Sequence, residues 1–258
     1  MSFLLDVQRI GISFGGLKAV QDFTLQIAHG ALHGLIGPNG AGKTTVFNLL
    51  TGVYLPQTGS IHLGGVSLMG RKPFQIAAAG LSRTFQNIRL FGELSVLDNV
   101  RIACHLRGRH SLTATVLRTS FYRRQEAAIE ERAMTLLSIF DLGDLAHEQA
   151  RNLSYGDQRR LEIVRALATV PKLILLDEPA AGMNPAEKIE LAKSIEQIRK
   201  QFNLTVLLIE HDMSLVMDIC ERITVLDYGQ IIAEGTPGEI QSNPKVIEAY
   251  LGEVVTES

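Results

Sequence analysis

The sequence predicts an α/β protein with a mostly parallel sheet in its core, an antiparallel β subdomain and a helical subdomain. Three observations support this fold class. An apolar strand, a glycine-rich loop and a helix follow one another within 31–51, strand signals vanish from about 93 to 168, and strands alternate with helices after Pro171. We therefore expect a single domain over 1–258, in which 1–92 and 169–258 form the α/β core and 93–168 form the helical subdomain.

Short patterns predict the individual elements in chain order. The first strands are expected in the brief apolar or alternating runs FLLDVQRI, FTLQI and ALHGLIG, and a helix is expected at 43–51. SIHLGGVSL contains a Gly-Gly pair typical of a hairpin, and apolar residues recur at helical spacing in 123–142. After Pro171 the expected elements are a strand in KLILLDE, a helix at 186–200, a strand in TVLLIEH, a helix at 213–220, a hairpin in ITVLDYGQIIAEG and a short helix in NPKVIEAYLG.

The composition narrows the class of function. Of the 258 residues, 46% are hydrophobic and 20% charged, which is typical of a globular protein. The formal net charge of −2 gives no electrostatic reason to expect nucleic acid as a partner. Cys104 and Cys220 lack CxxC or metal-ligand spacing, which favours inert thiols in a reducing compartment. The first residues lack a signal-peptide pattern and no apolar run reaches the ~18–20 residues of a membrane span, so we expect a soluble or peripheral protein.

The segment GPNGAGKT, which begins at Gly37, matches the phosphate-binding pattern G-x-x-x-x-G-K-[ST] between a strand and a helix. Its glycines let backbone N–H groups close around phosphate oxygens, and the helix N-terminus adds partial positive charge. Lys43 would reach the β- and γ-phosphates, and the Thr44 hydroxyl would bind Mg²⁺. The pattern predicts a P-loop NTPase core whose nucleotide-binding residues are Gly37, Asn39, Gly40, Gly42, Lys43, Thr44 and Thr45.

Two further strands end in residues suited to phosphoryl transfer. LILLDE ends in Asp177 and Glu178, and TVLLIEHD places His211 just past another apolar run. Because ligands bind at the carboxyl ends of parallel strands, we expect these side chains on the same edge as the glycine loop. Asp177 would bind Mg²⁺, Glu178 would be the general base, and His211 would donate to the γ-phosphate or the attacking water. Alone, a strand ending in acids is as typical of ordinary structure as of a site, and a single histidine is more often a satisfied or solvated side chain.

A third segment, NLSYGDQRRLEIV, has the pattern of a capped helix. Ser154 would be the cap, and Asp157 follows three residues later.

In this order the motifs resemble the nucleotide-binding subunits of ABC transporters. The matching segments are GPNGAGKTT, RTFQNIRLF, LSYGDQ, LILLDE and IEHD, and they span nearly the whole chain. The resemblance implies one ABC ATPase domain that hydrolyses ATP with Mg²⁺. It also implies that Phe14 stacks on adenine, that Gln86 contacts the metal and senses the γ-phosphate in the catalytic site, and that 181–184 cross between subunits. The alternative for Phe14 is a core aromatic, because FGG is a weak pattern.

The family pairs two cassettes head to tail, and this pairing implies a second role for the capped helix. The resemblance implies that Ser154 and the Gly156 amide bind the γ-phosphate of ATP on the other subunit, at a helix N-terminus that favours the anion. Tyr155, Asp157 and Asn184 stand where the family usually has Gly, Gln and Asp. None of the three removes a phosphate ligand or the base, so we expect hydrolysis to survive.

RTFQNIRLFGELSVLDNV, AAGMNP and NPKVIEAYLG resemble the ATPases of branched-chain amino-acid importers, specifically the first of that system's two ATPase subunits. The implied partners are two integral membrane permease subunits, docked in a groove near Gln86, a second ABC ATPase and, indirectly, a periplasmic binding protein. The second ATPase is a different chain in that system, and an identical chain stays open. No nucleic-acid partner is implied, and the implied location is peripheral, on the cytoplasmic face of the plasma membrane.

Other functions stay open at this point. The ATPases of urea or amide importers and of lipopolysaccharide export resemble this sequence over the core. An ABC ATPase acting on DNA or ribosomes would usually carry a coiled-coil insertion or a second glycine loop, and the sequence has neither pattern. A nucleotide-binding regulator without turnover is disfavoured by Glu178 and His211.

Overall fold

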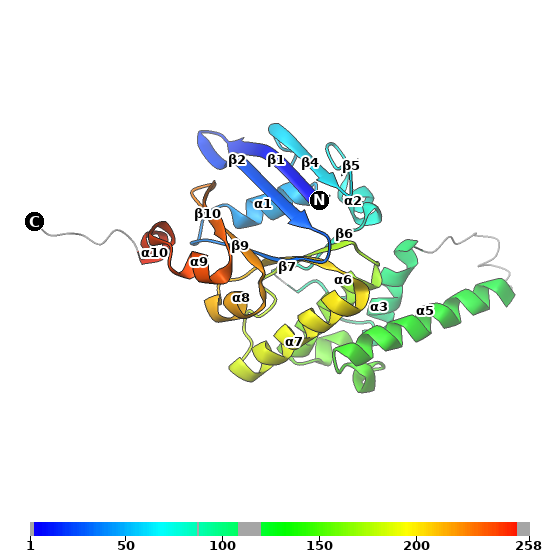
Figure 1. Ribbon diagram of the computed structural model, residues 1–258. Coiled ribbons are helices and arrows are strands. Elements are labelled where there is room, and N and C mark those ends of the chain that lie inside the picture. Colours follow the sequence, from blue (N-terminus) through cyan, green and yellow to red (C-terminus); the bar gives the residue numbers. More distant parts are fainter. Residues whose placement is uncertain (1–2, 87, 108–119, 252–258) are drawn as a thin grey trace, which may run out of the picture.

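Figure 1 shows the computed structural model, which describes residues 3–86, 88–107 and 120–251. Three predicted features extend beyond these residues. Part of the predicted helical subdomain, one residue of RTFQNIRLF and the last residue of NPKVIEAYLG lie outside the described residues.

Among the described residues the core is a six-stranded sheet in the order β10-β9-β3-β8-β7-β6. Its strands are β3 (Leu32–Ile36), β6 (Leu81–Arg83), β7 (Leu173–Asp177), β8 (Thr205–Ile209), β9 (Arg222–Asp227) and β10 (Gln230–Gly235). All neighbours pair in parallel except β9 and β10. β3, β7 and β8 are buried at every residue, because both faces of the sheet are covered.

A second, antiparallel sheet covers one face of the core. Its strands are β1 (Phe3–Phe14), β2 (Leu17–Ala28), β4 (Thr58–Leu63) and β5 (Val66–Ser67), in the order β2-β1-β4-β5. Helix α1 (Lys43–Leu50) lies beneath it in Figure 1. One hydrophobic cluster joins Phe23 of β2, Phe47 of α1 and Leu175 of β7. The glycine loop is therefore held between two sheets.

Helices cover the opposite face. They include α3 (Val96–Cys104), α5 (Ser120–Ile139), α6 (Tyr155–Ala168), α7 (Pro185–Phe202) and α8 (Met213–Ile219). The second hydrophobic cluster contains Ile174 of β7, whereas its neighbour Leu175 belongs to the first, as the alternation of side chains along a strand requires. In the described part of 93–168 the regular elements are α3, α5, α6 and the short 3-10 turns η1 (His105–Arg107), η2 (Gly143–Leu145) and η3 (Ala150–Asn152).

The predicted fold class and the predicted elements are confirmed, with shifts of a few residues at their ends. The elements that were not individually predicted include β6, α2 (Pro73–Ala79), α3, α9 (Pro237–Gln241) and the 3-10 turns. The C-terminal helix is α10 (Pro244–Leu251). Within the described ranges, no helix combines the length and apolar character that crossing a membrane requires.

Candidate active site

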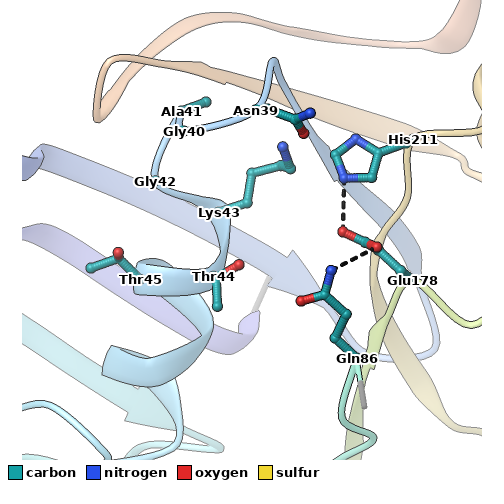
Figure 2. Close-up of a pocket in the computed structure, with 10 residues that line it drawn as sticks. All are labelled: Asn39, Gly40, Ala41, Gly42, Lys43, Thr44, Thr45, Gln86, Glu178 and His211. Carbon is teal, nitrogen blue, oxygen red and sulfur yellow. Dashed lines mark hydrogen bonds and ion pairs between the residues drawn. The ribbon is translucent and has the colours of Figure 1, made fainter.

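A cavity of about 580 Å³ opens where β3, β7 and β8 end (Figure 2). It brings together residues from the glycine loop, the segment after β6 and the ends of two strands. Its lining consists of Asn39, Gly40, Ala41, Gly42, Lys43, Thr44, Thr45, Gln86, Glu178 and His211. The parallel strands thus deliver the predicted phosphate loop, acid and histidine to one place, as their common direction requires.

Crowding by the neighbouring backbone explains two glycines of the loop. Gly37 has φ 150°, and a Cβ there would lie 2.0 Å from the carbonyl oxygen of Leu226. Gly42 has φ 106°, and its Cβ would lie 2.6 Å from the carbonyl oxygen of Ala19. Any side chain at either position would push the loop out of place.

Lys43 is buried at the start of α1 and folds back over the loop. Its ammonium donates to the carbonyl oxygens of Gly37 at 2.7 Å and Pro38 at 2.9 Å. Burial lowers the pKa of Lys43, and the negative charges of Glu178 and Asp177 act in the opposite direction. A positive charge held in a partly dry site is well placed to bind an anion such as a phosphate.

The Glu178 carboxylate is hydrogen-bonded to side chains from two other segments of the chain. Its Oε2 accepts from Gln86 Nε2 at 3.1 Å, and its Oε1 lies 2.7 Å from His211 Nε2 (Figure 2). Because an ionised carboxylate only accepts hydrogen bonds, His211 donates through Nε2. The backbone of Glu178 has φ 50°, a left-handed conformation that is uncommon outside glycine, and its N–H donates to the Ile209 carbonyl at 2.9 Å. The carboxylate is therefore fixed in direction, as a general base must be.

Asp177 lies behind the cavity rather than on its wall. It is 2% exposed, and its Oδ2 accepts from Arg83 Nη2 at 2.7 Å. Arg83 also donates to Asn48 Oδ1 of α1 at 2.8 Å. Arg83 therefore ties the segment before Gln86 to β7 and α1. It was missed in the sequence, where an arginine at the end of a three-residue strand gives no motif.

The donor set fits Mg²⁺ brought in with the phosphates of a nucleotide. The amide oxygen of Gln86 points toward Thr44 in Figure 2, so two neutral oxygens face the same space. Mg²⁺ usually takes few protein ligands and fills its octahedron with phosphate oxygens and water. Among the described residues no group of three or more histidine, cysteine, aspartate or glutamate side chains forms an all-protein metal cage. Asp177, the third predicted metal ligand, does not line the cavity and is paired with Arg83.

Phe14, Ser154 and Gly156 are not part of the cavity wall. Phe14 is 44% exposed at the end of β1 and meets the Tyr54 ring edge-on, with the ring centroids 5.1 Å apart, so it is not a core aromatic. Ser154 caps α6, which confirms the predicted capped helix: its Oγ accepts from the Asp157 N–H at 3.2 Å and donates to Asp157 Oδ2 at 2.7 Å. The cavity of this chain therefore does not bring Ser154 or Gly156 to the phosphate loop, and the predicted phosphate-binding role of these two residues requires a second chain.

Two residues without a predicted role also touch the site. Glu210 is buried after β8, and its carboxylate accepts the N–H groups of Ala180 at 2.7 Å and His211 at 3.1 Å. Burial raises the pKa of Glu210, and the backbone donors act against that shift. Tyr250 of α10 makes a hydrogen bond with the Gly37 backbone, and burial raises the pKa of its phenol. Glu210 thus joins the two strand ends that carry Glu178 and His211.

The fold and cavity together define a nucleotide-binding domain of the P-loop class, extended by an antiparallel sheet and a set of helices. The family model described as "ABC transporter" matches residues 20–181, and a second, "Branched-chain amino acid ATP-binding cassette transporter", matches residues 230–256. The chain belongs to the ABC transporter family, as an ATP-binding protein of that family. The predicted resemblance is thereby confirmed.

Relatives of known name cover almost the whole chain. The chain is 49% identical over 250 residues to the high-affinity branched-chain amino acid transport ATP-binding protein LivG of Salmonella typhimurium, covering 97% of this chain and 98% of the relative. BraF of Pseudomonas aeruginosa, with the same description, is 46% identical over 97% of this chain and 98% of the relative. The lipopolysaccharide export system ATP-binding protein LptB of Acidithiobacillus ferridurans is 36% identical over 98% of both chains.

Solved structures agree with the fold. An ATP-binding cassette of an ABC transporter in its ADP conformation superimposes with a TM-score of 0.85 at 31% identity, covering 98% of this chain and 100% of that one. A nucleotide-free ATP-binding cassette gives a TM-score of 0.84 at 30% identity over the same shares of the two chains.

Proposed function

We propose that this chain is the ATP-hydrolysing subunit of an ABC importer that powers uptake of branched-chain amino acids through partner membrane subunits. The ATPase activity is supported by one observation: Gln86 and His211 both contact Glu178, in the cavity that Lys43 also lines. The cargo is supported by the relatives: the two described as branched-chain amino acid ATPases are 49% and 46% identical to the chain, and the lipopolysaccharide exporter is 36% identical.

In this proposal the triphosphate of ATP lies in the glycine loop and the adenine stacks on Phe14. Lys43 exchanges its two carbonyl acceptors for β- and γ-phosphate oxygens, which are stronger acceptors because they are charged. Glu178 takes a proton from the attacking water, and His211 and Gln86 orient the carboxylate and sense the γ-phosphate. Mg²⁺, held by Thr44 and Gln86 with Asp177 behind them, would neutralise charge on the phosphates during transfer.

We further propose that a second cassette completes the site. Ser154 and the Gly156 amide of one chain would bind the γ-phosphate held by the other, and residues 181–184 would cross between them. This pairing explains why the capped end of α6 carries a predicted phosphate ligand without lining its own chain's cavity. The second cassette is a different ATPase chain in the favoured form of the proposal and an identical chain in the alternative.

The membrane partners would dock on the helical subdomain, residues 93–168. A groove of about 440 Å³ lies between α2 and α6 and is lined by Phe74, Phe85, Arg89 and Arg165 among others. Phe85 adjoins Gln86, so a permease segment in this groove would contact the backbone that carries a cavity residue. The subunit would then be peripheral, on the cytoplasmic face of the plasma membrane, and a periplasmic binding protein would deliver the amino acid.

Glu178→Gln tests the ATPase. It keeps the shape and the contact with His211 but removes the base, so the ATP turnover number should fall by about 10²- to 10⁴-fold while ATP binding persists. The matched control is Glu190→Gln, on the exposed surface of α7, which should leave turnover unchanged. Turnover by Glu178→Gln within twofold of wild type would refute the assignment of the base.

Co-purification and transport test the partners and the cargo. The tagged chain should bring down two integral membrane proteins and a second ATPase, and vesicles holding that complex should accumulate leucine only with ATP and a binding protein. Recovery of ribosomes or DNA instead, or ATP-dependent movement of lipopolysaccharide without leucine uptake, would refute the importer.

A further inference from the structure

Three charged side chains on one face of α6 contact the segment that contains Gln86. Arg159, Glu162 and Arg165 are spaced three residues apart, which places them on the same side of a helix. Arg159 and Glu162 are almost completely buried, and burial lowers the pKa of Arg165. Buried charges destabilise a fold unless they are paired and hydrogen-bonded. The groups that bond these three side chains therefore indicate what the three side chains do.

The partners are backbone groups of the glutamine segment, which we define as Phe85, Gln86, Arg89 and Phe91. Arg159 donates through Nη1 to the Phe85 carbonyl at 2.9 Å and through Nη2 to the Gln86 carbonyl.

Glu162 and Arg165 hold the same segment from the next turns of the helix. Glu162 Oε1 accepts the Phe85 N–H at 3.2 Å. Arg165 donates to the Arg89 carbonyl and lies over the Phe91 ring, 4.9 Å from its centroid. Side chains of α6 thus bind both an N–H group and carbonyl oxygens of the glutamine segment, and these bonds join the segment to the helix.

Tyr155, at the first turn of α6, completes the connection. Its phenol oxygen accepts from Arg159 Nη2 at 2.8 Å, and the guanidinium lies 5.3 Å from the centre of its ring. The ring also lies against the 181–184 loop: a Cβ on Gly182, where φ is 77°, would lie 2.8 Å from Tyr155 Cε1. The ring remains 49% exposed, so hydrophobic burial alone does not account for its position.

We propose that Tyr155 and Arg159 form a positioning pair that couples the two ATP sites of a cassette dimer. Arg159 fixes the backbone of Gln86, which lines this chain's cavity, and Tyr155 ties Arg159 and the Gly182 loop to the helix end that carries Ser154. A displacement of Gln86 by the γ-phosphate in its own site is thereby passed along α6 to the residue that faces the partner's ATP. The proposal rests on the proposed function, because it requires Ser154 to act in the second site.

Neither member of the pair is a catalytic residue, since neither lines the cavity. Tyr155→Phe removes only the phenol acceptor and keeps the ring against Gly182, so the chain should fold normally. In the assembled transporter the variant should show a turnover number reduced about three- to tenfold and a lower Hill coefficient for ATP. Binding of a fluorescent ATP analogue to the single chain should not change. Tyr228→Phe, in a turn where the side chain is 84% exposed, is the control and should match wild type.

A double-mutant cycle separates coupling from simple loss of structure. If Tyr155 acts through Gln86, then Tyr155→Phe should have no further effect on turnover in a Gln86→Ala background. Independent, multiplicative losses, or a Tyr155→Phe transporter with wild-type turnover and Hill coefficient, would overturn the coupling while leaving the proposed ATPase intact. A wild-type transporter without ATP hydrolysis would overturn both.

Discussion

Arg83→Met should destabilise the protein strongly because it leaves the carboxylate of Asp177 buried without its partner. The two side chains form an ion pair at 2.7 Å, with 7% of the arginine side chain and 3% of the aspartate side chain exposed. The arginine is also held by Asn48 and lies over the rings of Phe47 and Phe85, at 5.4 and 5.3 Å from their centroids. Methionine can occupy much of this volume, so the expected loss is electrostatic rather than a cavity.

The size of the effect follows from burial. Removing one partner of a buried ion pair typically costs about 3–5 kcal/mol, a large share of the ~5–15 kcal/mol that stabilises a folded domain. At roughly 2–4 °C per kcal/mol for a chain of this size, the melting temperature should fall by about 6–20 °C. The double variant Arg83→Met/Asp177→Asn should be more stable than the sum of the single effects predicts, because it leaves no unpaired charge.

Urea unfolding of the nucleotide-free chain measures these free energies. The matched control is Arg222→Met, which breaks the 3.1 Å ion pair with Glu234, whose side chains are 56% (Arg222) and 39% (Glu234) exposed. This variant should change the free energy of unfolding by less than about 1 kcal/mol. A loss below ~1 kcal/mol for Arg83→Met would show that Asp177 finds another partner or water, and would refute the reasoning.

Three further predictions concern pH, the partner site and adenine. Burial lowers the pKa of His33, whose Nε2 lies 2.8 Å from Thr224 Oγ1, to about 4. The neutral histidine therefore stabilises the fold fully above the pKa of ~6.5 that it has in the unfolded chain, and this stabilisation is lost as the pH falls through 4. His33→Gln should remove about 3 kcal/mol of the loss in unfolding free energy between pH 7 and 4, measured by urea unfolding. Asp157→Gln should lower the KM for ATP about fivefold in the assembled transporter, because a carboxylate beside Ser154 repels the γ-phosphate bound to the partner subunit by ~1 kcal/mol. An unchanged KM would mean that the Asp157 carboxylate points away from this phosphate. Phe14→Ala should weaken ATP binding to the single chain by ~1–3 kcal/mol in a titration, and equal affinities would exclude stacking on adenine.

Side chains that follow a strand or a glycine pattern could be predicted from the sequence. Lys43, Glu178 and His211 lie where strand direction places them, and strand direction is readable from apolar runs and their connections. The helix cap at Ser154 was equally readable, because capping depends on residues three positions apart.

Contacts between distant segments could not be predicted from the sequence. Arg83 and Asp177 are 94 positions apart and meet only because β6 pairs with β7, and β6 has three residues and a single partner strand. Such a strand is too short for a hydrophobic pattern to distinguish it from a loop. The same holds for Glu210, whose buried carboxylate is satisfied by backbone groups that no sequence pattern reveals.

The three departures from the usual family residues have different physical consequences. Asn184 caps α7, accepting the Glu187 N–H at 3.0 Å, and asparagine caps a helix about as well as aspartate does, so this change is conservative in structure. Asp157 lies in the first turn of α6 and accepts a hydrogen bond from the Ser154 hydroxyl, the group that would bind the partner's phosphate in the proposed dimer. Tyr155 adds contacts that a glycine could not make, to Arg159 and to Gly182. Because this last change joins the 181–184 loop to the arginine that holds the Gln86 backbone, we expect an effect of the departures on turnover to be found first at Tyr155.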